Sequence, residues 1–174
     1  MTFERNIAAA FHMTDAVWAR HANPWSVWTR MTVGPMLAVA IWSRAWIGWW
    51  SLLPVAASLV WMWVNPRLFP PPRSATSWAT RAVLGERIWV DRDRRAIPTR
   101  HRAAPHVLSA VSAAGLVPLG WGLAVFNPWA AGLGMAILCL AKLWFADRMV
   151  WLYEDVARGR SDLRDDAAPF RTPR

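Results

Sequence analysis

The sequence has little of the chemistry on which most small enzymes depend. It contains one cysteine, one lysine and one tyrosine, and only four histidines. The single cysteine, Cys139, excludes an internal disulfide, and because it lies in an apolar run we interpret it as a small packed side chain. No P-loop, nucleophile elbow or dinucleotide fingerprint is present. We therefore predict no cofactor and none of the common nucleotide-dependent or serine-hydrolase activities.

The histidines do not form a metal-binding pattern. His101 and His106 are five residues apart, whereas two imidazoles on one face of a helix need a spacing of four. No H-E-x-x-H motif occurs, and no second cysteine is available as a ligand. The sequence predicts no metal site, and ligation of a haem by two of the histidines stays an open alternative.

Acidic residues are scarce beside basic ones, with 11 Asp and Glu against 20 Lys and Arg and a formal net charge of +9. In a soluble protein this balance would indicate nucleic-acid binding. Here the arginines lie between long apolar runs that also hold most of the 15 tryptophans. Tryptophan is enriched where lipid meets water. We therefore expect the partners to be the lipid bilayer and its anionic lipids, and not nucleic acid.

The apolar runs predict an all-α integral membrane fold, with four transmembrane helices arranged as two hairpins in one domain over residues 1–174. The predicted spans are residues 25–43, 45–64, 107–126 and 128–157. The second span has 20 residues without a charge, so as a helix it would be ~30 Å long, the thickness of a bilayer core. Tight turns at Arg44 and at Asn127–Pro128 join the arms. Residues 158–174 predict a mobile, charged tail.

Two further segments are more polar. Residues 1–20 carry an apolar stripe at helical spacing and predict an amphipathic helix lying at the membrane interface. Residues 65–105 predict a basic connection that opens with NPRLFPPP, a motif unable to continue a helix. Within this connection, residues 77–87 predict a short surface helix capped by Ser77, and residues 88–98 a small hairpin or extended segment.

The distribution of arginine predicts the orientation in the membrane. Cytoplasmic loops carry an excess of Lys and Arg. If both termini are cytoplasmic, the inner side holds 18 arginines and the two outer turns hold one, Arg44. We therefore expect a multi-pass protein of the inner (plasma) membrane with both termini in the cytoplasm, and a working surface on the cytoplasmic side.

The last span contains ionisable groups after a long uncharged stretch. Lys142 and Asp147 can reach the cytoplasmic headgroups by snorkelling, or they can form an internal pair beside a polar pocket. The internal pair would be Lys142 with Asp147, or Asp147 with Arg30.

Small residues at spacings of four predict close packing of the third and fourth spans. The predicted rows are Ala110 with Ala114, Ala130 with Gly134, and Gly132 with Ala136.

An unusual block, RHANPWSVWTR, occupies residues 20–30 ahead of the first span. Asn23 and Pro24 are typical of the start of a helix, and the same Asn-Pro-Trp sequence recurs at residues 127–129. Capping does not explain His21 and Arg30, which flank the motif.

Together with NPRLFPPP (65–72), RAVLGERIW (81–89) and WLYEDV (151–156), this block resembles a family of small prokaryotic integral membrane proteins classed as a domain of unknown function. The resemblance covers roughly residues 10–158. It implies a membrane protein but no activity, cofactor or catalytic residue. From these blocks and the last span we take a candidate binding cluster on the cytoplasmic side: His21, Asn23, Trp25, Arg30, Asn65, Arg67, Trp78, Glu86, Arg87, Asp147 and Asp155.

Three functions stay open on this basis. The first is a non-enzymatic accessory or binding subunit whose cytoplasmic face contacts a membrane-protein partner or an anionic ligand, within a larger membrane complex or a homo-oligomer. The second is a membrane enzyme acting on a lipid or quinone-like substrate, which requires a histidine to converge with Glu86 or Asp147. The third is an oligomeric channel or transporter with Lys142 or Asp147 along its path.

Overall fold

The computed structural model describes residues 6, 9–92 and 97–166, without the side chains of 160–166. All regular elements in this part of the chain are helical, which confirms the predicted all-α class. In chain order they are α2 (Asp15–His21), α3 (Pro24–Met31), α4 (Val33–Trp42), α5 (Arg44–Ile47), η1 (Gly48–Ser51), α6 (Leu52–Leu68), α7 (Trp78–Val90), η2 (Thr99–His101), α8 (Ala103–Val125) and α9 (Pro128–Asp166).

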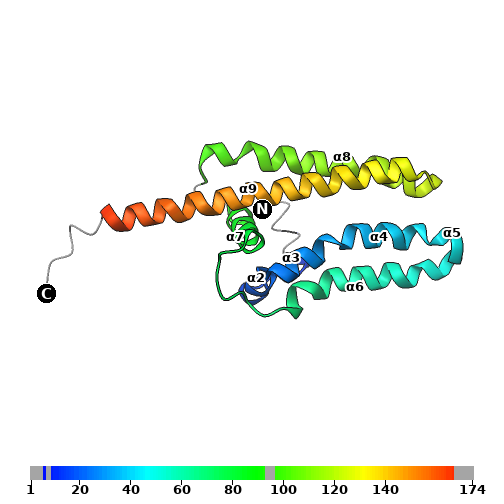
Figure 1. Cartoon of the computed structure of the whole chain (residues 1–174), viewed down its shortest axis with the longest axis horizontal. Coiled ribbons are helices and arrows are strands. Elements are labelled where there is room, and N and C mark those ends of the chain that lie inside the picture. The colour runs from blue at the N-terminus through cyan, green and yellow to red at the C-terminus, as the bar shows by residue number, and fades with distance from the viewer. Residues whose placement is uncertain (1–5, 7–8, 93–96, 167–174) are drawn as a thin grey trace.

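The first two arms, α4 and α6, lie side by side and antiparallel, joined through α5 and η1 (Figure 1). The single helix predicted over residues 25–43 is divided, because Thr32 separates α3 from α4. The turn is longer than the tight turn expected, since Gly48 has a positive φ of 55° that ends α5. The second arm consequently begins at Leu52, later than the sequence indicated.

The second arm also ends later than predicted. Although NPRLFPPP predicts the start of the connection, α6 runs through Asn65 and Pro66 to Leu68. A proline removes only one backbone donor, and here it does so in the last turns of the helix. The side chain of Asn65 is completely buried and holds this turn in the fold. The helix stops before Pro70, where three consecutive prolines begin.

The last two long helices, α8 and α9, are antiparallel and pack along each other (Figure 1). The predicted turn between them is present: Phe126 is left-handed with a φ of 56°, and Asn127 Oδ1 accepts a bond from Ala130 N–H at 3.0 Å. Residues 158–166, predicted as the start of a mobile tail, continue α9 as helix. Residues 167–174 lie outside the described part of the chain.

Small residues bring α8 and α9 together, but mostly not the residues predicted. A Cβ atom added to Gly122 would lie 2.2 Å from the Ala131 backbone nitrogen, and one on Gly134 would lie 2.3 Å from that of Leu119. Such distances allow only glycine at these two positions. Of the predicted rows, only Gly134 is buried at this contact. The others are exposed or partly exposed: Ala110, Ala114, Ala130, Gly132 and Ala136.

The helix predicted on the surface, α7, is instead part of the core. Its N-cap is confirmed, since Ser77 Oγ accepts from Thr80 N–H at 3.1 Å. Where α7 crosses α9, a Cβ on Gly85 would lie 1.9 Å from the Met149 carbonyl oxygen, so the backbones are in contact. The buried residues of α7 are Ala79, Thr80, Ala82, Val83, Gly85, Trp89 and Val90. Residues 88–90 are helical, not extended as predicted, and 93–96 lie outside the described residues.

The N-terminal segment is not one continuous helix. His12 has a positive φ of 48°, and Thr14 caps α2 by accepting from Val17 N–H at 3.4 Å. The amphipathic helix predicted over residues 1–20 is therefore interrupted, and residues 1–5 and 7–8 lie outside the described part.

Arg44, the one arginine of the two predicted outer turns, joins the two hairpins at their tips. Its Nη2 atom donates to the carbonyl oxygens of Leu123 at 2.6 Å and Ala124 at 2.7 Å. The guanidinium also lies 4.6 Å from the centre of the Phe126 ring. A cation here satisfies carbonyls left without partners at the C-terminus of α8.

Three helical stretches of the described chain are long and apolar enough to cross a membrane: Pro24–Leu68, Thr99–Val125 and Pro128–Gly159. The first of them contains both arms of the first hairpin. Only 11%, 22% and 28% of their apolar windows are buried within the protein. These faces therefore need a covering from outside the fold, as a membrane protein receives from lipid.

We expect Gly85→Ala to destabilise the protein, because the added methyl meets the Met149 backbone and no rotamer change can relieve the clash. Overpacking of this kind lowers the free energy of unfolding by ~1–3 kcal/mol. The measurement is SDS-induced unfolding in detergent micelles, followed by tryptophan fluorescence. Gly120→Ala is the control, because nothing lies within 4 Å of that position. Equal stability of the two variants would contradict the backbone contact.

Candidate functional site

A chain of hydrogen bonds fills the end of the first hairpin where α3 meets the C-terminus of α6. Ser26 Oγ donates to Asn65 Oδ1 at 2.9 Å, and Asn65 Nδ2 donates to Thr29 Oγ1 at 2.7 Å. Thr29 Oγ1 in turn donates to the Trp25 carbonyl oxygen at 2.6 Å. Ser26 and Asn65 are completely buried, so each needs these partners to offset the loss of water.

The direction of these hydrogen bonds fixes which ring nitrogen of His21 carries the proton. Its Nδ1 atom lies 3.1 Å from Ser26 Oγ. The only hydroxyl proton of Ser26 is given to Asn65, so Ser26 must accept and the imidazole proton must be on Nδ1. The other ring nitrogen, Nε2, is then a lone-pair acceptor, and it has no hydrogen-bond partner among the described residues. His21 is itself buried.

Charges from three elements surround His21. Burial and the positive charge of Arg30 lower the pKa of His21 from 6.5 to about 4, against an opposing effect of Glu86. Burial raises the pKa of Glu86, but nearby charges, Lys142 foremost, lower it by more, so its pKa lies below the usual value. Near neutral pH the histidine is therefore neutral and the glutamate ionised.

Asn23 joins the start of α3 to the connection that follows α6. Its Oδ1 atom accepts from Trp25 N–H at 2.9 Å, which confirms the predicted cap. Its Nδ2 atom donates to the Pro70 carbonyl oxygen at 2.9 Å. Next to it, Thr80 Oγ1 donates to the Ala22 carbonyl oxygen at 2.8 Å, which ties α7 to the same corner.

Arg67 and Arg30 hold the segment before α2 against the hairpin. Arg67 donates to the carbonyl oxygens of Trp63 and Phe11, and its guanidinium lies 4.0 Å from the centre of the Trp63 ring. The Arg30 guanidinium lies 5.5 Å from the centre of the Phe11 ring. Both arginines thus have contacts within the fold.

The ionisable groups of α9 pair with α7, and not as the sequence suggested. Asp147 Oδ1 accepts from Trp78 Nε1 at 3.2 Å, and Lys142 Nζ lies 3.6 Å from Glu86 Oε1. Neither predicted internal pair, Asp147 with Lys142 or with Arg30, forms among the described residues. Snorkelling alone does not describe Lys142 either, since it has an acidic partner on α7.

Four of the eleven candidate residues lie where α3 meets the end of α6: His21, Asn23, Asn65 and Arg67. Trp78, Glu86 and Asp147 lie where α7 packs on α9, and Arg30 lies beside Phe11. The other three lie elsewhere. Trp25 is 70% exposed, with only its backbone in the network. Arg87 pairs with Asp15 of α2. Asp155 lies on another part of α9 and accepts from His101 Nε2 at 2.5 Å.

Sequence reasoning missed several polar residues that the fold uses. Ser26 and Thr29 are one turn apart on α3, a spacing that places both on the face of Asn65. His101 and Arg100 converge on Asp155, and Arg81 pairs with Glu154 at 2.8 Å. These contacts join residues that are 54 to 73 positions apart, and no local pattern signals them.

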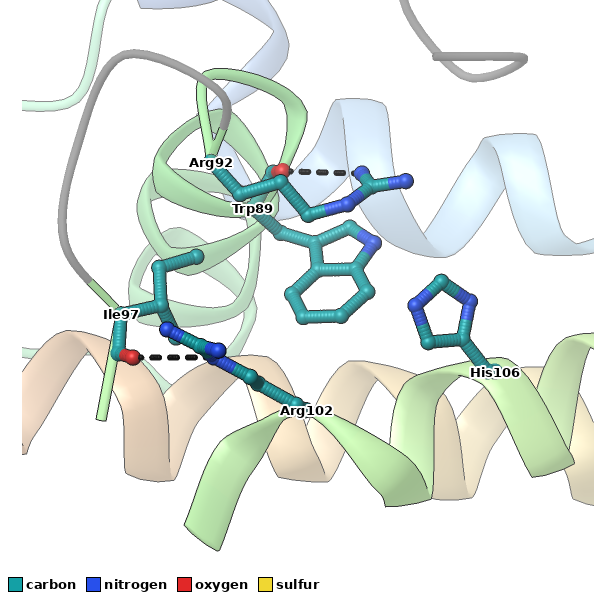
Figure 2. Close-up of a pocket in the computed structure, with 5 residues that line it drawn as sticks. All are labelled: Trp89, Arg92, Ile97, Arg102 and His106. Carbon is teal, nitrogen blue, oxygen red and sulfur yellow. Dashed lines mark hydrogen bonds between the residues drawn. The ribbon is translucent and has the colours of Figure 1, made fainter. Parts of the chain in front are cut away.

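A separate pocket of about 310 Å³ lies between the end of α7 and the start of α8. It is lined by Trp89, Arg92, Ile97, Arg102 and His106 (Figure 2). In the described part of the chain, no group of three His, Cys, Asp or Glu side chains could hold a metal ion.

The chain belongs to a family of unknown function, DUF6653. The family model matches residues 2–169, which confirms the resemblance seen in the sequence. No curated protein and no solved structure matches the chain. Membership in DUF6653 assigns no activity, so the geometry has to carry any functional proposal.

We expect the stability of this DUF6653 protein to fall as pH is lowered from about 7 to about 5. The unfolded chain binds a proton at His21 below pH 6.5, whereas the folded chain does so only near pH 4. The stabilisation is thus complete above pH 6.5 and is lost toward pH 4, with about 2 kcal/mol lost by pH 5. SDS unfolding at each pH measures it.

The comparison variant is His21→Asn, which keeps a donor to Ser26 but cannot titrate. It should lose most of this pH dependence, while His12→Asn, at an exposed histidine, should keep it. An unchanged pH dependence in His21→Asn would contradict the assignment to this buried imidazole.

Proposed function

We propose that this chain is a four-span protein of the inner membrane, with both termini in the cytoplasm. Two groups of exposed tryptophans support the membrane placement. Along α9, Trp129 and Trp151 are 87% and 52% exposed, and their 22-residue separation corresponds to ~33 Å of helix, about one bilayer core. Exposed tryptophans near the hairpin turns also include Trp46, Trp49, Trp50 and Trp121, and those toward the other end include Trp25, Trp28 and Trp63.

The charges support the orientation. The two hairpin turns carry one arginine, Arg44, and it is bound to carbonyl groups of α8. The other arginines among the described residues lie toward the opposite ends of the hairpins or beyond them. Under the positive-inside rule, the side of α7 faces the cytoplasm.

We further propose that the protein works by binding, at its cytoplasmic face, to a membrane-protein partner or an anionic ligand. One observation carries this choice over an enzyme: each candidate acid–base group has a different partner. His21 bonds Ser26, His101 bonds Asp155, and His106 meets the edge of the Trp89 ring. The carboxylates of the enzyme hypothesis pair with Lys142 and Trp78. General acid–base catalysis needs such groups around one cleft.

The topology is tested with single cysteines in a Cys139→Ala background. Trp49→Cys, in the turn of the first hairpin, should react with a membrane-impermeant maleimide added to intact cells. Ser74→Cys, in the exposed connection between α6 and α7, should react only after the membrane is permeabilised. The opposite pattern would contradict the proposed orientation, and labelling of both from outside would contradict membrane insertion.

The binding role is tested by purifying the full chain from its native membrane in a mild detergent after crosslinking. We expect a stoichiometric protein partner or a bound anionic molecule, measured by native mass spectrometry. A chain that is isolated alone and without ligand in repeated preparations would contradict a binding role.

A further inference from the structure

The pocket between α7 and α8 has a basic, semi-rigid rim. Arg92 Nη1 donates to the Trp89 carbonyl oxygen at 3.0 Å, and its guanidinium lies 4.4 Å from the centre of the Trp89 ring. Arg102 Nε donates to the Ile97 carbonyl oxygen at 3.3 Å. Each arginine is therefore held by a backbone group before any ligand arrives, which lowers the entropy cost of binding an anion.

The third polar group on the rim is His106, whose ring meets the edge of the Trp89 indole at 5.1 Å between centroids. Figure 2 shows Arg92 and His106 beside the indole and Arg102 beyond it toward Ile97. Neither the Nη atoms of Arg102 nor the ring nitrogens of His106 have a hydrogen-bond partner among the described residues. These donors are available to phosphate oxygens.

Beyond the pocket, α8 carries a row of exposed apolar side chains, which we call the apolar track. After His106, positions 107, 110, 111 and 114 lie three or four residues from one another, so they share one face of the helix. The four side chains are Val107, Ala110, Val111 and Ala114, and all are exposed. The alanines leave the track shallow, and Val107 and Val111 border it with 59% and 43% exposure.

Basic rim and apolar track together match one kind of ligand. A phospholipid carries a phosphate at one end and acyl chains beyond it, and this fold places a basic pocket at the start of α8 and exposed apolar residues further along the same helix. A guanidinium pair attracts an anionic headgroup and repels a choline. The fold presents both features on the side that the charge distribution places in the cytoplasm.

We propose that this pocket binds the phosphate of an anionic phospholipid of the cytoplasmic leaflet, with an acyl chain along Val107–Ala114 of α8. The inference rests on the proposed membrane placement and names a ligand for the proposed cytoplasmic binding face. Arg102 and His106 bond the phosphate oxygens, and Arg92 supplies charge from α7. The lipid thereby bridges the end of α7 and the start of α8.

The test is a titration of the full chain in detergent micelles with phosphatidylglycerol, followed by native mass spectrometry. The double variant Arg92→Gln/Arg102→Gln should bind at least about tenfold more weakly, since each basic group near a lipid surface contributes roughly fivefold. Arg102→Gln alone, at an exposed side chain, should cost about fivefold and leave the fold intact, as checked by circular dichroism.

The matched control is Arg73→Gln/Arg148→Gln, which removes the same charge from this side of the protein outside the pocket. It should weaken binding by less than the pocket double variant does, because neither residue lines the pocket. Equal losses in the two double variants would overturn the site in favour of diffuse surface attraction. Equal binding of phosphatidylcholine, or of glycerol phosphate without acyl chains, would overturn the assignment to an anionic lipid.

This experiment is independent of orientation, because lipid in micelles reaches both ends of the protein. If the pocket variants lose lipid binding but the cysteine labelling contradicts the orientation, the proposed topology is wrong and the lipid site still stands. If the labelling pattern is as expected but the pocket variants bind lipid as the control does, the lipid site is wrong and the proposed topology still stands.

Discussion

The structure depends on the hydrogen bonds of one buried side-chain amide in otherwise apolar surroundings. Asn65 both accepts from and donates to hydroxyl groups of α3, and no part of its side chain is exposed. An unpaired amide at such a position would cost several kilocalories per mole. This requirement fixes the spacing of α3 and α6, aligns Ser26, and through Ser26 sets the tautomer of His21.

The corner made by α2 and α3 then becomes the platform for α7. Thr80 donates to the Ala22 carbonyl oxygen, and small buried side chains of α7 pack against the same corner. On its opposite face, α7 meets α9 through Gly85 without a side chain between the backbones. The helix is therefore held from both sides, and it connects the first hairpin to the second at one end, as Arg44 does at the other.

Much of this arrangement could be predicted from local sequence. The helix caps Asn23 and Ser77 and the turn at Asn127 depend on neighbouring residues, and all were found where predicted. The apolar helices followed from uncharged runs.

The failures have a common physical cause in contacts between distant segments. NPRLFPPP is a local helix-ending motif, but burial of Asn65 extends α6 through it. The arginines of α7 suggest a surface helix, yet its small residues, including Gly85, bury it against α9. Lys142 found its acidic partner on α7, 56 positions away along the chain, and helical periodicity cannot report such a pair.

The last helix, α9, is longer than a bilayer is thick. α9 contains 39 residues, which corresponds to ~58 Å of continuous helix, whereas a bilayer with its headgroups is ~40–45 Å thick. In the proposed membrane placement, roughly 15 Å of this helix, ending in a charged stretch, stands clear of the lipid. In that placement, a tilt of the membrane-embedded half of α9 displaces this tip outside the bilayer, because the helix is continuous.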